Sequence, residues 1–361
     1  MASASARFDG WLNEGGPAAL VLREHLMSVE GRDGVVFPAT FASVGYNIDP
    51  PDGGDVCLID SVGSQANRLE PIFAQPSCRG LVPQIIIRAG THQVNLLEAG
   101  HRAGDAIARC ASGLSDDLQR AFTALQAGDA EPLAKIAPTS LVFGVWDSRG
   151  TQAKAPRLLS STIRAFDVMK LTRSAQYAPA VPYVEEGLLE EPVDKKMSDA
   201  YAQRGFIHVP ATGSHGGVIA KGGIRRDASI HLAALRLLRT SDAGQALRLR
   251  RYILGLALVA FTRGTPGFLR QGCNLVRDPD TATDCKMVFG DGRSERVELS
   301  FDEAIEYARA VASDFGIDPN REIPGRPDRE VEFSSDLARQ DVSPDAAEKG
   351  KKKRKGAAKK G

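Results

Sequence analysis

Short apolar runs rich in β-branched residues recur along the first 150 residues and alternate with stretches of helical spacing. The runs at residues 19–22, 56–59, 84–87 and 141–146 are typical of buried strands. Residues 115–127 place Leu118, Phe122 and Leu125 on one face behind a candidate cap at Ser115, as an amphipathic helix does. This alternation favours an α/β or an α+β fold.

The second half of the chain continues the same mixture. Apolar positions over residues 229–262 predict a pair of helices around residues 242–244, and residues 268–299 predict strands separated by turns. Ser300 and Glu303 then form a capping box at the start of a further helix. The sequence has no repeat of fixed period, which disfavours solenoids and propellers.

Three stretches lack this regular pattern. Residues 174–228 mix Pro, Gly and an acidic run (residues 185–194) with little periodicity, so we expect an inserted functional segment there. Residues 318–361 predict a C-terminal tail, and its Lys-rich end is expected to be disordered from residue 342. Residues 1–16 lack the basic flank and apolar core of a secretory signal, and we expect a flexible N-terminus.

The formal net charge of +1 over 361 residues hides an uneven distribution. Residues 349–361 carry eight positive charges and no negative ones, which leaves the remaining residues with a net charge of −7. A mildly acidic body does not attract nucleic acid as a whole. Any site for a polyanion must therefore be a local patch.

Sequence signatures of catalysis are missing. HExxH, GxSxG, a Walker loop and a strand-borne GxGxxG do not occur, and the five cysteines form no CxxC pair. The longest apolar run, residues 252–261, is about half of the roughly 20 residues that a bilayer helix needs. We expect a soluble, cytoplasmic protein without metal or cofactor, and we keep His215, in a Gly-rich segment, as a candidate general base.

One segment that could bind an anion is the stretch of residues 60–73, which follows a predicted strand. As a helix it would bury an apolar stripe and present Ser61, Ser64, Gln65 and Arg68 on the opposite face. Hydroxyls, an amide and a guanidinium near a helix N-terminus suit an anionic oxygen. A capped helix with a solvated polar face would show the same pattern, so both interpretations stay open.

Two further segments are locally basic. Residues 149–173 hold six basic residues and one acid, and their STIRAFDV portion predicts a strand with Arg164 beside Phe166. Sheet-based RNA binders combine charge and stacking surface in this way, although a solvated edge strand would look alike. Residues 213–223 are Gly-rich, and glycine lets backbone N–H groups approach phosphates closely.

The order of these strings resembles a known family. FPATF at residues 37–41, DSVGSQANRLE at 60–70, VWDSRG at 145–150 and PRLLSSTIRAFDVMKLTRSAQY at 156–177 are similar to the Cas seven-type RAMP protein of type I-G CRISPR systems, formerly called I-U. The similarity spans roughly residues 17–315, and its two longer strings are the specific part.

The resemblance implies an α+β fold, with a modified RRM-like (ferredoxin-like) palm over residues 17–317. Fingers would be inserted within about residues 75–137 and a thumb within about residues 174–228. It also implies a non-catalytic subunit that binds CRISPR guide RNA. Several copies would form a helical filament along the guide within a Cascade complex, together with other Cascade subunits. The filament would present the guide for pairing with target DNA in antiviral defence, without a membrane partner.

The resemblance implies guide-backbone contacts for individual residues. Within the two matched strings the assignment falls on Ser64, Gln65, Asn67, Arg68, Arg157, Arg164 and Arg173. The chemistry of the Gly-rich segment and its flank adds Lys221, Arg225 and Arg226. Asn67 lies off the helical face derived above, and the resemblance gives no role to the acidic run at residues 185–194.

Two other functions are compatible with the sequence. One is a RAMP endoribonuclease that processes guide RNA or cleaves target RNA, for which His215 or Asp147 would be the candidate catalytic residue. The other is a structural protein with no nucleic-acid role, whose basic clusters are solvated surface residues. Nucleic acid that copurifies with the protein would argue against the purely structural role. An RNA cleavage assay would test the endoribonuclease.

Overall fold

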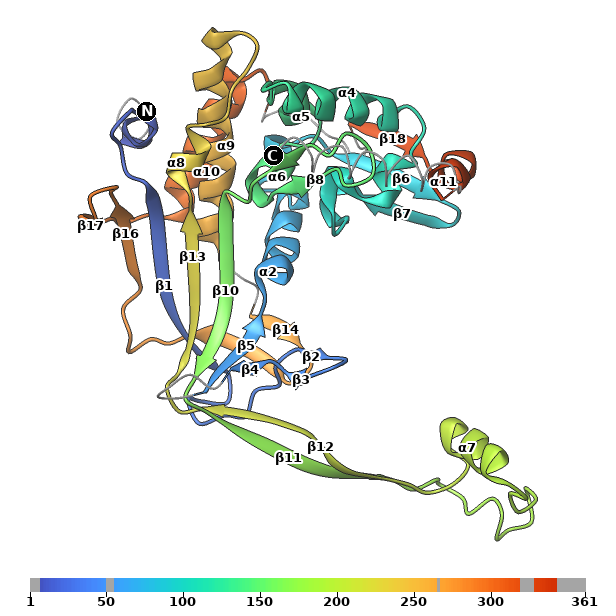
Figure 1. Cartoon of the computed structure of the whole chain (residues 1–361). Helices are drawn as coiled ribbons and strands as arrows, with labels where there is room; N and C mark the ends of the chain where they lie inside the picture. Colours follow the sequence, from blue (N-terminus) through green and yellow to red (C-terminus); the bar gives the residue numbers. More distant parts are fainter. Residues whose placement is uncertain (1–6, 50–54, 265–266, 319–327, 343–361) are drawn as a thin grey trace, which may run out of the picture.

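A nine-stranded antiparallel sheet forms the centre of the structure (Figure 1). The structure is a computed structural model, and it describes residues 7–49, 55–264, 267–318 and 328–342. Along the chain come β1 (Ala19–Ser28), α2 (Val62–Leu69), β10 (Leu159–Phe166), β13 (Ile224–Ile230), α9 (Ala243–Arg263) and β16 (Asp284–Val288). The four strands lie in the order β16–β1–β13–β10. This is the βαββαβ pattern of a ferredoxin-like fold, so the expected α+β class with an RRM-like palm is confirmed.

Shorter strands extend the sheet at its margins. β5 (Val56–Asp60) and β4 (Ile48–Asp49) continue it beyond β10. β15 (Cys273–Arg277) pairs with the end of β1 and with β14 (Phe268–Arg270), and β17 (Ser294–Arg296) pairs with β16. The strands predicted within residues 19–22, 56–59 and 268–299 are therefore present.

Helices cover one face of the sheet. α9 packs against β13 and against α10 (Phe301–Asp314), which starts with the predicted capping box of Ser300 and Glu303. The helix pair predicted over residues 229–262 is only partly right. β13 runs to Ile230, and the single turn of α8 (Leu232–Leu235) precedes α9, whose N-cap is Asp242.

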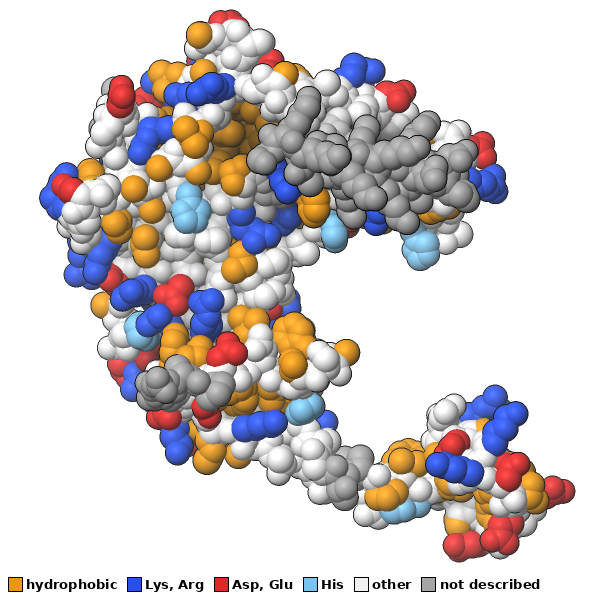
Figure 2. All heavy atoms as spheres, in the orientation of Figure 1, with side chains coloured by type: hydrophobic (Ala, Val, Ile, Leu, Met, Phe, Trp, Pro, Cys, Tyr) orange, Lys and Arg blue, Asp and Glu red, His pale blue; other side chains and the backbone are white. Residues whose placement is uncertain are grey.

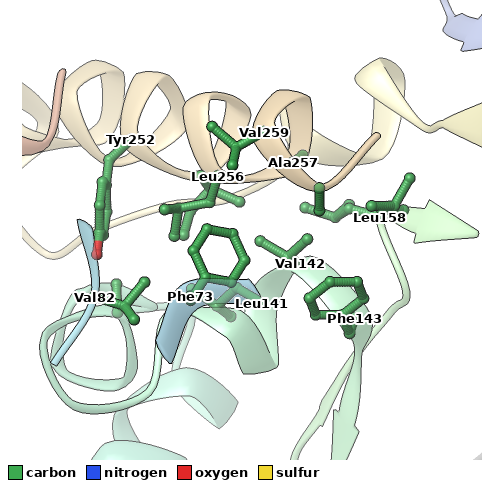
Figure 3. Close-up of a cluster of buried hydrophobic side chains, with 14 of the residues drawn as sticks. Phe73, Val82, Leu141, Val142, Phe143, Leu158, Tyr252, Leu256, Ala257 and Val259 are labelled. Atoms are coloured by element: carbon green, nitrogen blue, oxygen red, sulfur yellow. The ribbon is translucent and has the colours of Figure 1, made fainter. Parts of the chain in front are cut away.

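The chain between α2 and β10, residues 70–158, forms a side lobe beside the sheet (Figure 1). Figure 3 shows Phe73 and Val142 of this lobe in one buried cluster with Leu256 of α9. The short 3-10 helices and other elements of the lobe are η2 (Glu70–Ala74), η3 (Arg79–Leu81), β6 (Ile85–Ala89), β7 (His92–Asn95), η4 (Leu96–Glu98), η5 (Arg102–Gly104), α3 (Ala106–Arg109), α4 (Leu114–Gln126), α5 (Glu131–Ile136), α6 (Thr139–Phe143), β8 (Val145–Trp146) and β9 (Lys154–Ala155).

Two sequence predictions in this lobe need correction. The strand predicted over residues 141–146 is wrong, because residues 139–143 form α6 and only Val145 and Trp146 are extended. All five residues of α6 are buried, and a short apolar run that is buried all round has no periodicity to distinguish helix from strand. The helix predicted from residue 115 is α4, but it begins at Leu114 after Gly113 rather than at a Ser115 cap.

Both ends of the described chain are more ordered than expected. Phe8 and Trp11 are buried in the main core, so residues 7–12 are not a flexible N-terminus. β18 (Arg329–Glu332) pairs in parallel with β6, and α11 (Ser335–Asp341) follows it. The expectation of a simple tail beyond residue 318 is therefore wrong for these two elements. Residues 1–6 and the Lys-rich end at 349–361 lie outside the described residues.

The inserted segment between β10 and β13 is a long arm, residues 168–220. β11 (Val168–Tyr177) and β12 (Val209–Ala220) form a two-stranded ribbon that projects from one end of the sheet and carries α7 (Lys195–Arg204) near its tip (Figure 1). The rings of Tyr183, Tyr201 and Phe206 pack together in the tip. Much of the span expected to be the thumb, residues 174–228, lies in this arm. Residues 213–220 of the Gly-rich segment belong to β12, and Lys221 and Gly222 lie in the turn that follows.

A second cluster of buried side chains fills the end of the sheet from which the arm projects. Ile163 of β10 and Val218 of β12 belong to it, with Tyr46 of the small hairpin of β2 (Thr40–Phe41) and β3 (Gly45–Tyr46). The backbone N–H of Gly217 donates to the Tyr46 hydroxyl at 3.1 Å. These contacts fix the base of the arm to the sheet.

Candidate nucleic-acid interface

Asp60 organises the beginning of α2. Its buried carboxylate accepts hydrogen bonds from Ser64 Oγ at 2.8 Å and from Gln65 Nε2 at 2.6 Å. The guanidinium groups of Arg68 and Arg270 also donate to it, at 3.1 and 2.8 Å. Two cations share one carboxylate here, so one positive charge stays in excess beside the helix.

The expected exposure of Gln65 is wrong. The residue is fully buried, and its Oε1 accepts from Ser161 Oγ at 2.9 Å where α2 packs on β10. The sequence pattern placed Gln65 on the polar face, but β10 covers that part of the helix. Ser64 and Arg68 keep part of their surface, and Asn67 is exposed. Gln65 therefore orients Asp60 rather than facing solvent.

A chain of contacts continues from α2 to the base of the arm. Arg270 Nη1 donates to the backbone oxygen of Phe37 at 3.5 Å, and the guanidinium of Arg173 lies 5.7 Å from the centroid of the Phe37 ring. Figure 1 shows α2, β14 and the base of the arm in succession on the side that faces the space between side lobe and arm. We call Asn67, Arg68, Arg270, Phe37 and Arg173 the inner strip.

At the other end of the inner strip lies a cleft of about 850 Å³. Asn67 lines it on one side, and His101, Arg102, Lys154 and Arg157 line it from the side lobe. In Figure 2, Lys and Arg side chains gather in the recess where the long strands meet the side lobe. No Asp or Glu is among the described residues that line the cleft. The cleft is therefore positively charged.

A buried ion pair supports the floor of the cleft. Arg102 Nε lies 2.7 Å from Glu70 Oε2, and Arg102 Nη2 donates to Asn67 Oδ1 at 3.0 Å. Arg102 has a φ of 55°, which is unusual for a residue with a side chain and shows that the surroundings force this backbone geometry. Burial raises the pKa of Glu70 to about 7, and Arg102 opposes the shift. Burial, and then the charge of Arg102, lower the pKa of Arg157.

Arg164 and Arg225 lie elsewhere, on the face of the sheet opposite to the helices. They are direct neighbours in the pairing of β10 with β13, and Arg225 also pairs with His25 of β1. The Arg225 guanidinium lies 4.7 Å from the Phe166 ring centroid and donates to Asp227 at 2.8 Å. Arg164 and Phe166 lie on the same side of β10, as predicted, but the guanidinium over the ring belongs to Arg225.

Lys221 and Arg226, the other two basic residues of the Gly-rich segment and its flank, do not lie on this surface. Arg226 follows Arg225 in the same strand, so it points to the opposite face, where it is buried and donates to Glu24 at 2.6 Å. Its prediction as an exposed phosphate contact is therefore not supported. Lys221 is exposed in the turn after β12, and it lines a pocket together with Arg32, Asp33 and Asp278.

The two candidate catalytic residues, Asp147 and His215, both contact neighbouring residues of the fold. Asp147 is buried and accepts from the N–H groups of Gly150 and Thr151 and from the Thr151 hydroxyl, which closes the turn between β8 and β9. The His215 ring lies 4.6 Å from the Tyr46 ring, between centroids. Within the described residues, no group of three His, Cys, Asp or Glu side chains is arranged to hold a metal ion.

Sequence reasoning missed Arg270, Arg102, Lys154 and Trp146. Arg270 and Arg102 are distant in sequence from the strings that carried the argument, and only the fold brings them to α2. Trp146 and Lys154 pair across the short β8–β9 hairpin, and the turn-forming residues between them were an available signal.

Comparison with known proteins bears on this interface. Residues 20–170 match the model of the family described as CRISPR-associated protein GSU0053. The match supports a relation to CRISPR-associated proteins. It includes α2, the side lobe and Arg164, and it ends before Arg173 and most of the arm. No curated protein matches the chain. In the described part of the chain, no helix has the length and apolar character needed to cross a membrane.

Proposed function

We propose that this protein is a non-catalytic backbone subunit of a CRISPR surveillance complex and that it binds the sugar-phosphate chain of the guide RNA. Several copies would assemble along one guide and present it for pairing with target DNA. The family match over residues 20–170 supports the CRISPR context. The observation that carries the RNA-binding role is the inner strip with its adjoining cleft.

The charges along this surface fit a phosphate chain. Arg68 and Arg270 share Asp60, which leaves one positive charge in excess, and Glu70 pairs with Arg102 but not with the neighbouring Arg157. Arg173 and Lys154 make no ion pair with any described residue. Guanidinium, ammonium, hydroxyl and amide groups recognise phosphate and sugar without reading a base sequence. We therefore expect little base preference from a single copy.

Arg164 and Arg225 would form a second contact surface on the open face of the sheet. That surface faces away from α2, because α2 packs on the other face of β10, where Gln65 contacts Ser161. Our proposal therefore assigns the guide backbone to the inner strip and keeps the open face as an additional RNA contact.

The direct test is to isolate the protein without nuclease treatment and to sequence the nucleic acid that accompanies it. We expect RNA of uniform length that contains CRISPR repeat sequence. Absence of RNA, or random cellular fragments, would argue against the proposal. Labelled guide RNA incubated with the protein should also stay intact with and without Mg²⁺, whereas cleavage would favour a nuclease.

A further inference from the structure

The cleft beside α2 has one feature that phosphate binding alone does not explain, namely the exposed indole of Trp146. The side chain is 48% exposed, although burial of a Trp ring is ordinarily favourable. It lies on the two-residue strand β8, which pairs with β9 so that Trp146 is opposite Lys154. The ring lines the same cleft as Arg157 and Asn67.

Close contacts fix the backbone of the hairpin that carries this ring. Asp147, the next residue, is buried and closes the turn through three hydrogen bonds. A side chain on Gly104 would come within 2.9 Å of the Trp146 backbone oxygen, so the hairpin packs closely against η5. The Lys154 ammonium lies 4.4 Å from the ring centroid. Proteins that bind single-stranded nucleic acid stack bases on exposed aromatic rings that lie beside cations.

Arg157 supplies the matching site for a phosphate. Its Nε donates to the backbone oxygen of Phe143 at 3.0 Å, which fixes the guanidinium in the wall of the cleft. It forms no ion pair with any described residue, and Arg102 nearby adds a like charge. An anion in the cleft would relieve this repulsion. The cleft volume of about 850 Å³ is within the range of ~300–1,000 Å³ that is usual for small-molecule sites.

We propose that this cleft is a nucleotide subsite for single-stranded RNA, in which Trp146 stacks on a base and Arg157 binds the adjoining phosphate. The inference rests on the proposed RNA-binding function and adds to it a place where each copy holds one base by its aromatic face. Stacking accepts any base, so the subsite holds RNA without reading its sequence.

Trp146 fluorescence offers a direct test. The chain has two tryptophans, and Trp11 is buried in the main core, away from this cleft. Titration of the full-length protein with a single-stranded oligouridylate should quench the emission of Trp146, whereas inorganic tripolyphosphate, which has no base, should not. Trp146→Leu should abolish the quenching that RNA causes.

Affinity measurements with variants complete the test. Trp146→Ala should weaken binding of the oligouridylate about 5- to 100-fold, and Trp146→Phe should restore most of it because the ring is kept. Arg157→Ala should weaken binding and reduce the slope of log affinity against log salt by about 0.7, the value for one phosphate on a single strand. Leu237→Ala serves as the matched control, because Leu237 is 72% exposed and lies outside the cleft.

The outcomes separate the two proposals. If the protein binds the oligouridylate and Arg173→Ala weakens binding, but the Trp146 variants change neither affinity nor quenching, the subsite is wrong and the RNA-binding function stands. If the unmodified protein does not bind RNA, the proposed function fails and the subsite fails with it.

Discussion

Two buried carboxylates arrange the arginines of the candidate interface. Asp60 accepts from Arg68 and Arg270, and Glu70 pairs with Arg102, which lies beside Arg157. A guanidinium held by a carboxylate has fewer rotamers to lose when it binds a phosphate. Because the carboxylates are fewer than the cations they hold, positive charge remains for a ligand.

This arrangement predicts different consequences for Arg68 and Arg164. Arg68→Ala removes one of four donors from a buried carboxylate, so it should lower the free energy of unfolding by about 1–3 kcal/mol. Arg164 makes no ion pair with any described residue, and Arg164→Ala should change the free energy of unfolding by only about 0.5 kcal/mol. Urea denaturation measures both values.

Both substitutions should also weaken RNA binding, which anisotropy with a labelled oligoribonucleotide would measure. Arg293→Ala is the matched control, since Arg293 pairs with Glu295 on the surface near β17, outside both candidate surfaces. If Arg68→Ala destabilises the fold and leaves RNA affinity unchanged, Arg68 is a structural partner of Asp60 and the inner strip loses one of its members.

Glu70 predicts a pH dependence of stability. Its pKa is raised to about 7 by burial, from 4.5, so the folded state holds the proton more tightly than the unfolded state. The stability from this group is full below pH 4.5 and is lost as the pH rises towards 7. Between pH 5 and pH 7.5 the wild-type protein should lose roughly 1–3 kcal/mol through this group.

Glu70→Gln removes the titration and keeps the size of the side chain. Urea denaturation of both proteins at pH 5 and pH 7.5 should therefore show a smaller fall in unfolding free energy for Glu70→Gln. Equal falls in the two proteins would contradict the raised pKa and indicate that Arg102 keeps Glu70 ionised.

At the scale of elements, the spacing of apolar residues identified the helices that bury one face and expose the other. α4 and α10 each combine buried and exposed positions, and their helical spacing identified them, whereas β1 and β5 were identified as short apolar runs. α6 is buried all round, and β12 is Gly-rich, so neither carries a readable period. β18 is a four-residue strand whose partner, β6, lies more than 200 residues earlier. Such pairing depends on the fold and cannot be inferred from local sequence.

We expect the tip of the arm to contribute little to the stability of the rest of the protein. The hydrogen bonds and ring contacts of its described tip stay within the arm, as in the bond from the Tyr177 hydroxyl to the Gly205 backbone oxygen. Replacing residues 178–208 by a short Gly-Ser linker should therefore leave the melting temperature of the body nearly unchanged. Differential scanning calorimetry would measure this, and a large loss would show that the tip packs on the body.

The same deletion tests assembly under the proposed function. If the arm joins successive copies on a guide, the shortened protein should bind a fixed-length RNA with fewer copies or with less cooperativity. Native mass spectrometry would count the copies. An unchanged count and unchanged cooperativity would remove the arm from the account of assembly.

At the scale of the whole molecule, the sequence indicated the chemistry of the interface better than its geometry. Arg225 and Arg226 are adjacent in sequence, yet one lies on the open face of the sheet and the other is buried against Glu24. Strand alternation fixes that they point to opposite faces, but only the packing of the helices decides which face is covered. Asn67, Arg68, Arg157 and Arg173 do lie along one surface, and Arg270 joins them through the fold.

The central claim is that the inner strip and its cleft bind a single-stranded RNA backbone through uncompensated positive charges, and its most direct test is the salt dependence of affinity. At pH 8, where Glu70 is ionised, the four excess charges there predict a slope of log affinity against log salt of about −3, since each phosphate contributes about −0.7. Arg173→Ala should make the slope shallower by about 0.7, and Arg293→Ala should leave it unchanged. Affinity for RNA that is nearly independent of salt, or the same slope in Arg173→Ala as in wild type, would contradict the account.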